Sequence, residues 1–186
     1  MIRSFKTEGI IIKRRNFGEL DRLLTIFTKY NGKIQVRAPG VRKITSRRSS
    51  HIELLNLSVL TLYKSSRSLF PILTEAQTLE NFLPIKNNLP KVGFAYYICE
   101  LVDRLCPDNQ ENKKAFFLFK DTLYGLGSNY NSDSIVEDFE DGLLATLGFL
   151  PKLHKLRDKQ AFIENILERK LATKRLLPLF LNNCKC

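Results

Sequence analysis

The hydrophobic period of the sequence changes once, near residue 78, and this change limits the possible folds more than any other feature. Before it, apolar residues alternate with polar ones or form short runs rich in β-branched and aromatic side chains, which predicts strands. After it, apolar residues recur every three or four positions, which predicts helices. Strands followed by helices indicate an α+β chain with segregated halves. We therefore expect two domains, over residues 1–79 and 80–186.

Five strand-like runs occupy the first half. The clearest covers residues 33–38, where strict alternation follows the turn signal Asn31-Gly32 and predicts that Lys33, Gln35 and Arg37 face outward. The other runs cover residues 10–15, 23–28, 54–64 and 67–74. Five strands in about 75 residues suit a small closed barrel, which leaves no exposed sheet edge.

Four apolar stripes at helical spacing occupy the second half. They cover residues 94–105, 116–126, 139–147 and 162–167. The acidic cluster at 137–141 could suggest a magnesium site, but such clusters more often supply the favourable negative charge of a helix's first turns. Asp133 and Ser134, just upstream, are the predicted caps of that helix.

The sequence contains no recognisable catalytic apparatus. Neither His51 nor His154 has a second histidine or a carboxylate at metal-ligand spacing. No G-x-x-x-x-G-K-[ST] motif is present, so hydrolysis of a nucleotide through a P-loop is not supported. We therefore expect a protein that is not an enzyme and that binds no metal and no cofactor.

Composition indicates a globular protein of the cytoplasm. Of the 186 residues, 44% are hydrophobic, enough to form a core, yet no apolar stretch is long enough to span a bilayer. The first residues lack the apolar core of a signal peptide, so we expect a cytoplasmic location and no membrane partner. Cys99 and Cys106 share one helical face and are expected to be reduced structural thiols, while the role of Cys184 and Cys186 stays open.

The formal charge of +11 is distributed unevenly. Residues 1–80 hold 15 Lys/Arg against 6 Asp/Glu, a net of +9, whereas residues 81–186 hold 15 against 13, a net of +2. A one-sided positive field of this size favours polyanions, since each phosphate neutralised releases counterions. DNA, RNA and, less favourably, an acidic membrane surface all stay open on charge alone.

The densest basic stretch runs from Gly32 to Arg48, along a predicted strand and the loop that follows it. Arginine can bind phosphate oxygens in a bidentate manner and can stack on unpaired bases. Any one of these cations could simply solvate the outside of a barrel, but so many on a half with few acids favour a nucleic-acid surface. The candidate nucleic-acid-binding residues are Lys13, Arg14, Arg15, Lys33, Arg37, Arg42, Lys43, Arg47, Arg48, Lys64 and Arg67.

Several motifs occur in an order and at spacings that are together specific. They are residues 7–12 (TEGIII), residues 17–28 (FGELDRLLTIFT), Gly40-Val41-Arg42 followed by Ser46-Arg47, residues 100–105 (ELVDRL), residues 147–153 (LGFLPKL) and residues 170–177 (KLATKRLL). In these motifs, over most of its length, the sequence resembles the RecO family of bacterial recombination mediators.

The resemblance implies an N-terminal oligonucleotide-binding (OB) barrel and a C-terminal helical domain. It also implies a non-enzymatic role in recombinational DNA repair. Members bind single- and double-stranded DNA, anneal complementary strands, and act with RecR and with the C-terminal tail of single-strand-binding protein.

One departure from the family pattern concerns zinc. Many members carry a zinc-binding cysteine loop after the segment that matches residues 147–153, whereas here residues 153–157 run almost directly into the last apolar stripe. Cys184 and Cys186 are misplaced and too few to replace four ligands. We expect a shortened, metal-free helical domain.

The tail of single-strand-binding protein is acidic and apolar, so its dock should offer cations beside aromatic rings. Lys113, Lys114, Phe117 and Lys120 meet this requirement. The neighbouring Phe116 and Phe119 lie at helical spacing, which favours a place in the core.

Two rival functions stay open. An RNA-binding or ribosome-associated OB-fold protein would share the charge and the strands, but it should prefer RNA through contacts to the 2′-hydroxyl. An inert adaptor whose basic half binds an acidic protein would bind no nucleic acid.

Overall fold

The computed structural model describes residues 3–66, 68–128, 131–150 and 158–182. The chain divides into two compact units, the first formed by Met1–Asn81 and Pro107–Phe116 and the second by Phe82–Cys106 and Phe117–Cys186. Strands lie in the first unit and helices dominate the second, so the predicted α+β class is confirmed. A division into domains at residues 79 and 80 stays a prediction, and the return of residues 107–116 to the first unit was not expected.

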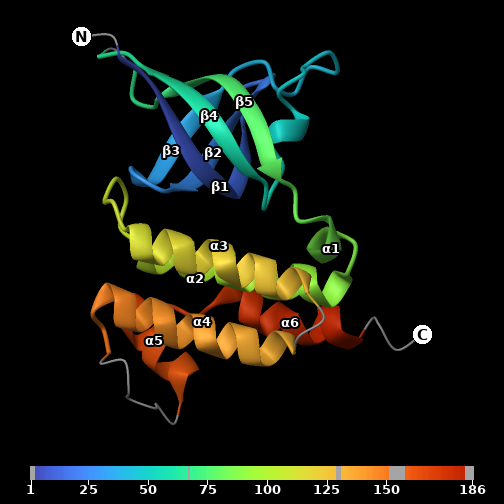
Figure 1. Ribbon diagram of the computed structural model, residues 1–186, viewed down its shortest axis with the longest axis vertical. Helices are drawn as coiled ribbons and strands as arrows, with labels where there is room; N and C mark the ends of the chain where they lie inside the picture. Colours follow the sequence, from blue (N-terminus) through green and yellow to red (C-terminus); the bar gives the residue numbers. More distant parts are fainter. Residues whose placement is uncertain (1–2, 67, 129–130, 151–157, 183–186) are drawn as a thin grey trace. The chain divides into compact units, whose positions relative to one another are not determined.

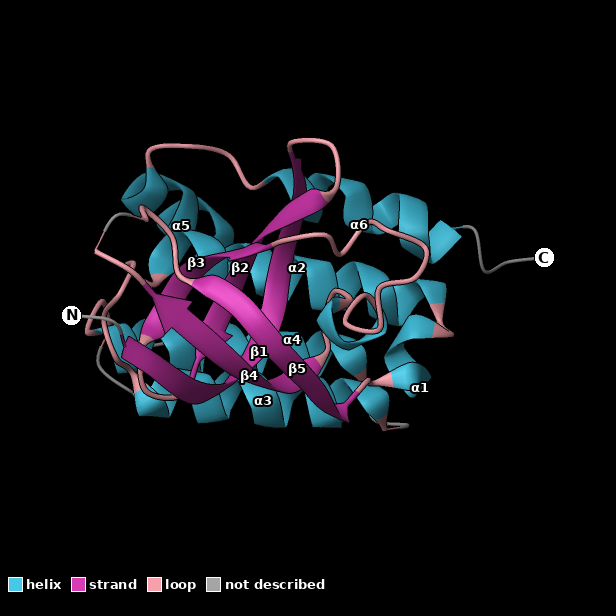
Figure 2. Cartoon of the chain, turned by 90° about the horizontal axis from the view of Figure 1, so that it is seen from above, coloured by secondary structure: helices cyan, strands magenta, loops and turns pink. Residues whose placement is uncertain are grey.

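The first unit is a closed five-stranded barrel (Figure 1). Its strands are β1 (Arg3–Phe17), β2 (Asp21–Thr28), β3 (Gly32–Ala38), β4 (Leu57–Lys64) and β5 (Ile72–Glu80), in the order β1-β2-β3-β5-β4. The first half of β1 pairs with β4 and its second half with β2, with an irregular register between Ile11 and Lys13. Figure 2 shows β1, β4 and β5 crossing side by side. A short parallel pairing, Arg37 with Ile72, closes the ring and leaves no long open edge.

Alternating apolar residues fill the barrel. In β3 the period of two places Ile34, Val36 and Ala38 in the core, as the sequence predicts. The other members of this core come from every strand and from the connection between β3 and β4: Ile11, Leu24, Ile26, Val41, Ile52, Leu60, Leu62 and Leu73.

The fifth strand begins later than predicted, at Ile72 rather than at residue 67, and ends at Glu80. The preceding loop has its own local bond, since the Ser68 hydroxyl donates to the Phe70 carbonyl at 2.6 Å. Pro71 then supplies no N–H for a sheet. The fourth strand also begins later, at Leu57, because Leu55 adopts a positive φ of 69° that is incompatible with a strand.

Residues 107–116, here called the strap, lie along the β2–β3 hairpin. The ammonium group of Lys33 pairs with the Asp108 carboxylate at 3.2 Å, and the amide of Asn109 donates to the Lys33 carbonyl at 2.8 Å. The rings of Phe27 and Phe116 lie 6.2 Å apart. Lys33 lies on the outer face of the barrel, as predicted, but it is only 8% exposed because the strap covers this end of β3.

The second unit consists of helices. They are α1 (Leu83–Lys86), α2 (Leu89–Leu105), α3 (Lys113–Gly127, whose first four residues belong to the strap), α4 (Ser132–Leu147), α5 (Lys159–Leu167) and α6 (Ala172–Asn182). The four predicted stripes are confirmed as α2 to α5. Periodicity did not identify α6, which contains Pro178. α6 packs closely on α2 because Gly93 has no side chain: a Cβ there would lie 2.9 Å from the Phe180 ring.

The start of α4 differs from the prediction. Its cap is Asn131, whose side chain accepts the Asp133 amide at 3.0 Å, so Asp133 and Ser134 lie inside the helix. The acidic cluster at 137–141 therefore occupies the middle of α4 rather than its first turn. Two of its members pair with other helices, Glu140 with the Tyr97 hydroxyl at 2.5 Å and Asp141 with Lys159 at 2.7 Å.

The structure also locates some of the cysteines and histidines discussed from the sequence. Cys99 and Cys106 are buried free thiols, and burial raises the pKa of Cys99 above its ordinary value. Nδ1 of His51 accepts the Thr78 amide at 3.2 Å, which gives this histidine a structural partner. Cys184, Cys186, His154 and Arg67 lie outside the described residues.

The described residues hold no group of three or more His, Cys, Asp or Glu side chains arranged to bind a metal ion. Among the helices of the described ranges, none combines the length and the apolar character required to cross a membrane.

Candidate nucleic-acid interface

Two predicted arginines share the outer face of β1, β2 and β3. Arg15 of β1 and Arg37 of β3 both pair with Leu23 of β2, and directly paired residues lie on the same face of a sheet. Lys13, two residues before Arg15 on β1, lies on this face as well. All three cations are exposed.

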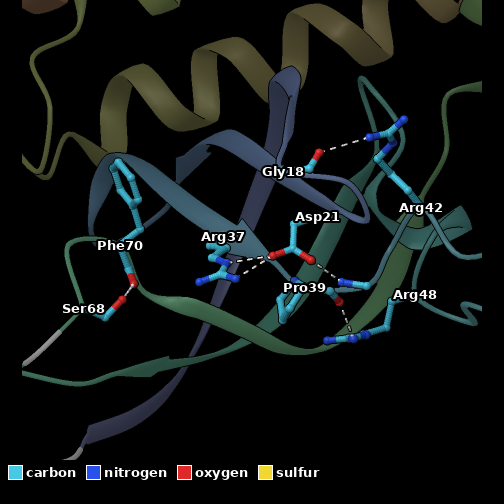
Figure 3. Close-up of polar contacts among 9 residues, drawn as sticks. Gly18, Asp21, Arg37, Pro39, Arg42, Arg48, Ser68 and Phe70 are labelled. Carbon is cyan, nitrogen blue, oxygen red and sulfur yellow. Dashed lines mark hydrogen bonds and ion pairs between the residues drawn. The ribbon is translucent and has the colours of Figure 1, made fainter.

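Asp21 ties this sheet face to the loop that follows β3 (Figure 3). Its Oδ2 accepts Nε of Arg37 at 2.8 Å, while its Oδ1 accepts the amide of Gly40 at 2.8 Å. The Gly40 amide lowers the pKa of Asp21 most; burial opposes this shift, and Arg37 and Lys43 reinforce it. The carboxylate therefore fixes the start of the loop next to Arg37.

An exposed aromatic ring lies beside the same arginine. The guanidinium of Arg37 lies 5.5 Å from the ring centroid of Phe17, which is 40% exposed. An exposed ring next to a cation can stack on an unpaired base while the cation approaches a phosphate.

Two arginines of the 39–49 loop hold its backbone in place. Nη1 of Arg42 donates to the Glu19 carbonyl at 2.6 Å and, at 3.3 Å, to that of Gly18. Nη1 of Arg48 donates to the Leu73 carbonyl at 2.6 Å and its Nη2 to the Pro39 carbonyl at 2.8 Å. Both side chains keep their charge near the predicted surface, but their donors are partly used by the fold.

Lys43 and Arg47 are the exposed cations of this loop that remain available. Within the described ranges, neither has a carboxylate within ion-pair distance. We call the exposed cations of the sheet and of the loop together the basic face: Lys13, Arg15, Arg37, Lys43 and Arg47.

The loop between β4 and β5 borders the basic face. Lys64, the last residue of β4, is exposed and leads into this loop. At the other end of the loop, the Pro71 carbonyl accepts a hydrogen bond from the Arg37 amide at 2.9 Å. In OB folds this loop, the first hairpin loop and the β2–β3 face are the usual oligonucleotide-binding elements.

Two predicted residues do not join the basic face. Arg14 pairs with Leu24, which lies in the barrel core, so it points towards the inside at the end of the barrel and forms an ion pair with Glu53 at 2.5 Å. Lys33 lies under the strap, paired with Asp108. Both were predicted from charge alone, and both have a carboxylate partner distant in the sequence.

The residues proposed to bind a partner's tail are divided between the units. Lys113 and Lys114 are exposed on the strap, while Phe117, 41% exposed, and Lys120 belong to the second unit. Phe116 and Phe119 are fully buried, which confirms their place in the core. The dock itself stays a prediction.

Sequence reasoning missed Asp21, Phe17 and Tyr30. The first two lie within the 17–28 motif, so the sequence did contain a signal for them. A count of charges, however, treats an aspartate only as a reduction of the positive charge and not as a residue that positions cations. Tyr30, in the β2–β3 turn, is 49% exposed and has the ammonium groups of Lys29 and Lys113 at 5.1 and 5.0 Å from its ring centroid. Nothing in the sequence brings Lys113 to Tyr30.

Family comparisons agree with both units. Residues 1–82 match the family described as "Recombination protein O N terminal", and residues 86–156 match "Recombination protein O C terminal". The chain belongs to the RecO family. The N-terminal family domain is of the OB type, in agreement with the closed barrel.

Curated relatives carry the name DNA repair protein RecO. That of Roseiflexus sp. (strain RS-1) is 40% identical over 153 residues, which are 82% of this chain and 53% of the relative. That of Dehalococcoides mccartyi (strain ATCC BAA-2100 / JCM 16839 / KCTC 5957 / BAV1) is 36% identical over 151 residues, 81% of this chain and 59% of the relative. The matched segments therefore span between half and three fifths of these relatives.

Proposed function

We propose that this chain is a non-enzymatic DNA-binding recombination mediator that binds and anneals single strands in recombinational DNA repair. The observation that carries this proposal is the basic face, where five exposed cations and the exposed ring of Phe17 gather on the outer side of β1–β3 and the adjoining loop. Cations there would neutralise phosphates and so reduce the repulsion between two complementary strands. Stacking on Phe17 would favour unpaired bases.

The proposed partners are single- and double-stranded DNA, RecR and the tail of single-strand-binding protein, as family membership suggests. Duplex DNA would bind through the same cations, since phosphate contacts do not depend on sequence. A peptide with the acidic, apolar character of the tail should bind through Lys113 and Lys114. Binding that is indifferent to alanine at both positions would remove this dock from the proposal.

The direct test is a strand-annealing assay with the Lys43→Ala/Arg47→Ala variant. These cations line the loop without a structural bond in the described residues, so their removal should leave the barrel folded. Each phosphate contact to a single strand contributes about 0.7 to the salt slope of binding, so the double variant should lower the slope by about 1.4. Annealing of complementary DNA strands should slow in parallel.

The matched control is Lys6→Ala/Lys170→Ala, which removes the same charge elsewhere. Lys6 is exposed and pairs with Thr61 across β1 and β4, on another side of the barrel, and Lys170 is exposed in the second unit. Equal losses in both double variants would mean that net charge, not the basic face, drives binding. A clear preference for RNA strands over DNA strands would favour the rival RNA-binding function.

A further inference from the structure

A pocket of about 550 Å³ opens on the first unit beside the basic face. Its walls come from the end of the β1–β2 turn and from the 39–49 loop. The lining residues are Leu20, Asp21, Pro39, Gly40, Lys43, Thr45, Ser46, Arg47 and Arg48. This volume lies within the range of pockets that hold small organic ligands, and it exceeds what a phosphate group alone would fill.

The charges of the pocket favour an anion. Lys43, Arg47 and Arg48 contribute three positive charges to its walls. Among the described residues of the lining, the one acid is Asp21, which already accepts bonds from Arg37 and from the Gly40 amide. Its negative charge is therefore compensated before any ligand arrives.

The cations differ in how firmly they are held. Two backbone carbonyls, those of Pro39 and Leu73, fix the Arg48 guanidinium at the wall. Lys43 and Arg47 are exposed and have no ion-pair partner in the described ranges, so their donors can turn towards a ligand. The hydroxyl groups of Thr45 and Ser46 add neutral donors, a set that suits phosphate oxygens.

The remaining lining is apolar. Leu20 is 42% exposed and Pro39 is half-buried. Neither side chain can bind a phosphate, but both can cover the face of a flat aromatic group. Cations and hydroxyls together with apolar side chains match the chemistry of a nucleotide, which joins an anion to a planar base.

We propose that this pocket receives one nucleotide of an unpaired strand, with its phosphate on Lys43 and Arg47 and its base against Leu20 and Pro39. The inference rests on the proposed function and adds to it a defined subsite for a single base. Asp21 connects this subsite to the Phe17–Arg37 pair, because the same carboxylate lines the pocket and binds Arg37. Paired bases could not enter, so the subsite distinguishes single strands from duplex.

The test uses the full chain with Leu20→Ser and two probes, a ten-residue oligothymidylate and an abasic strand of equal length. Leu20→Ser should weaken binding of the oligothymidylate by roughly five- to tenfold, within the range of one lost base contact, and leave the abasic strand unaffected. The control is Leu89→Ser, which removes a 44% exposed leucine at the start of α2, in the second unit. That control should change neither affinity.

The possible results of this test distinguish a failure of the nucleotide subsite from a failure of the proposed DNA-binding function. Oligothymidylate binding that Leu20→Ser does not change would overturn the subsite while leaving the DNA-binding proposal intact. Equal weakening for both probes would also overturn it, because the loss would then not concern a base. No binding of either probe by the unaltered chain would overturn the proposed function itself.

A second measurement needs no variant. Thymidine 5′-monophosphate, titrated into the unaltered chain, should shift the amide resonances of Gly40, Lys43 and Ser46 in a saturable manner. Thymidine without the phosphate should shift them less, because the cations would lose their ligand. Saturable shifts elsewhere but none at these amides would overturn the subsite.

Discussion

A single residue, Asp21, both positions its neighbours on the basic face and reduces the positive charge there. It accepts bonds from Arg37 and from the Gly40 amide, and thereby joins two parts of the basic face. The Arg37 guanidinium, 46% exposed, is held over Phe17 while it is paired. A carboxylate at the centre of a cationic surface therefore organises that surface and also weakens its field.

Asp21→Asn should separate these two effects. The amide oxygen can still accept the Gly40 N–H, but the ion pair with Arg37 is lost, which should cost about 0.5–1 kcal/mol of unfolding free energy. Removing one negative charge should tighten binding of single-stranded DNA roughly two- to fivefold at low salt. Denaturation and fluorescence anisotropy measure the two effects, and Glu75→Gln on β5 is the control. Weaker DNA binding with unchanged stability would contradict the expected field effect.

Among the secondary-structure elements, the packing of the strap against the β2–β3 hairpin depends on one glycine, Gly32. Gly32 has φ of 65°, and a Cβ there would lie 2.0 Å from the Gln110 carbonyl oxygen. The same hairpin end holds the Lys33–Asp108 pair and the contact of Phe27 with Phe116. The close approach of the two backbones is possible only without a side chain.

Gly32→Ala should destabilise the chain more than Gly18→Ala does. Gly18 has a similar φ of 62° but nothing within 4 Å of its ideal Cβ. Alanine there should lower the unfolding free energy only by the cost of a left-handed backbone conformation, about 1–2 kcal/mol. At Gly32 the displacement of the strap should add about 1–3 kcal/mol. Chemical denaturation of the two variants measures the difference, and equal losses would show that the strap does not resist displacement.

Glu100 of α2 caps the first turn of α6. Its carboxylate accepts the amides of Ala172 and Thr173, at 3.1 and 2.8 Å, and the Thr173 hydroxyl. Burial raises the pKa of Glu100, but these hydrogen bonds outweigh burial and hold it below the ordinary value of 4.5. Periodicity did not identify α6, and this cap is one reason why the segment is nevertheless helical.

The cap should make stability depend on pH. Because the folded pKa of Glu100 is lowered, its contribution is present above about pH 4.5 and is lost as the pH falls through the folded pKa. Glu100→Gln should cost about 1 kcal/mol at pH 7. In urea denaturation the difference in unfolding free energy between the unaltered chain and the variant should shrink as the pH falls below about 4.5. A gap that stays constant with pH would contradict this assignment.

Charge is the property that belongs to the whole molecule. The formal +11 is concentrated in the strand-rich half, and five exposed cations of that half form the basic face. Of the other predicted cations, Arg42 and Arg48 clamp loops, and Arg14 and Lys33 pair with carboxylates. Lys64 is exposed at the end of β4, and Arg67 lies outside the described residues. Net charge alone therefore overestimates the number of phosphate contacts.

Five contacts at about 0.7 each predict a salt slope of about 3.5 for single strands, so affinity should fall about a hundredfold between roughly 50 and 200 mM salt. Titration of a labelled oligonucleotide at several salt concentrations measures the slope. A slope near 8 would show that the predicted cations outside the basic face also contact DNA. A slope near zero would exclude phosphate recognition by the basic face.

The fold class and the family could be predicted from the sequence alone. A side-chain period of two or of about 3.6 is a local property, so it survives without coordinates, and the 17–28 motif already contained Asp21 and Phe17. The core residues of β3 were also predicted correctly, because the alternation along a strand determines which side chains point inward.

Which cations are available to a ligand could not be predicted from the sequence, because it depends on how the chain folds in three dimensions. Arg14 and Lys33 are basic in the sequence like Lys43 and Arg47, but Glu53 and Asp108 reach them through the fold. The pocket beside Leu20, the strap on Gly32 and the cap from Glu100 likewise join segments far apart in the chain. Ion pairs and close packing depend on distances in space, and a period along one strand or helix carries no information about those distances.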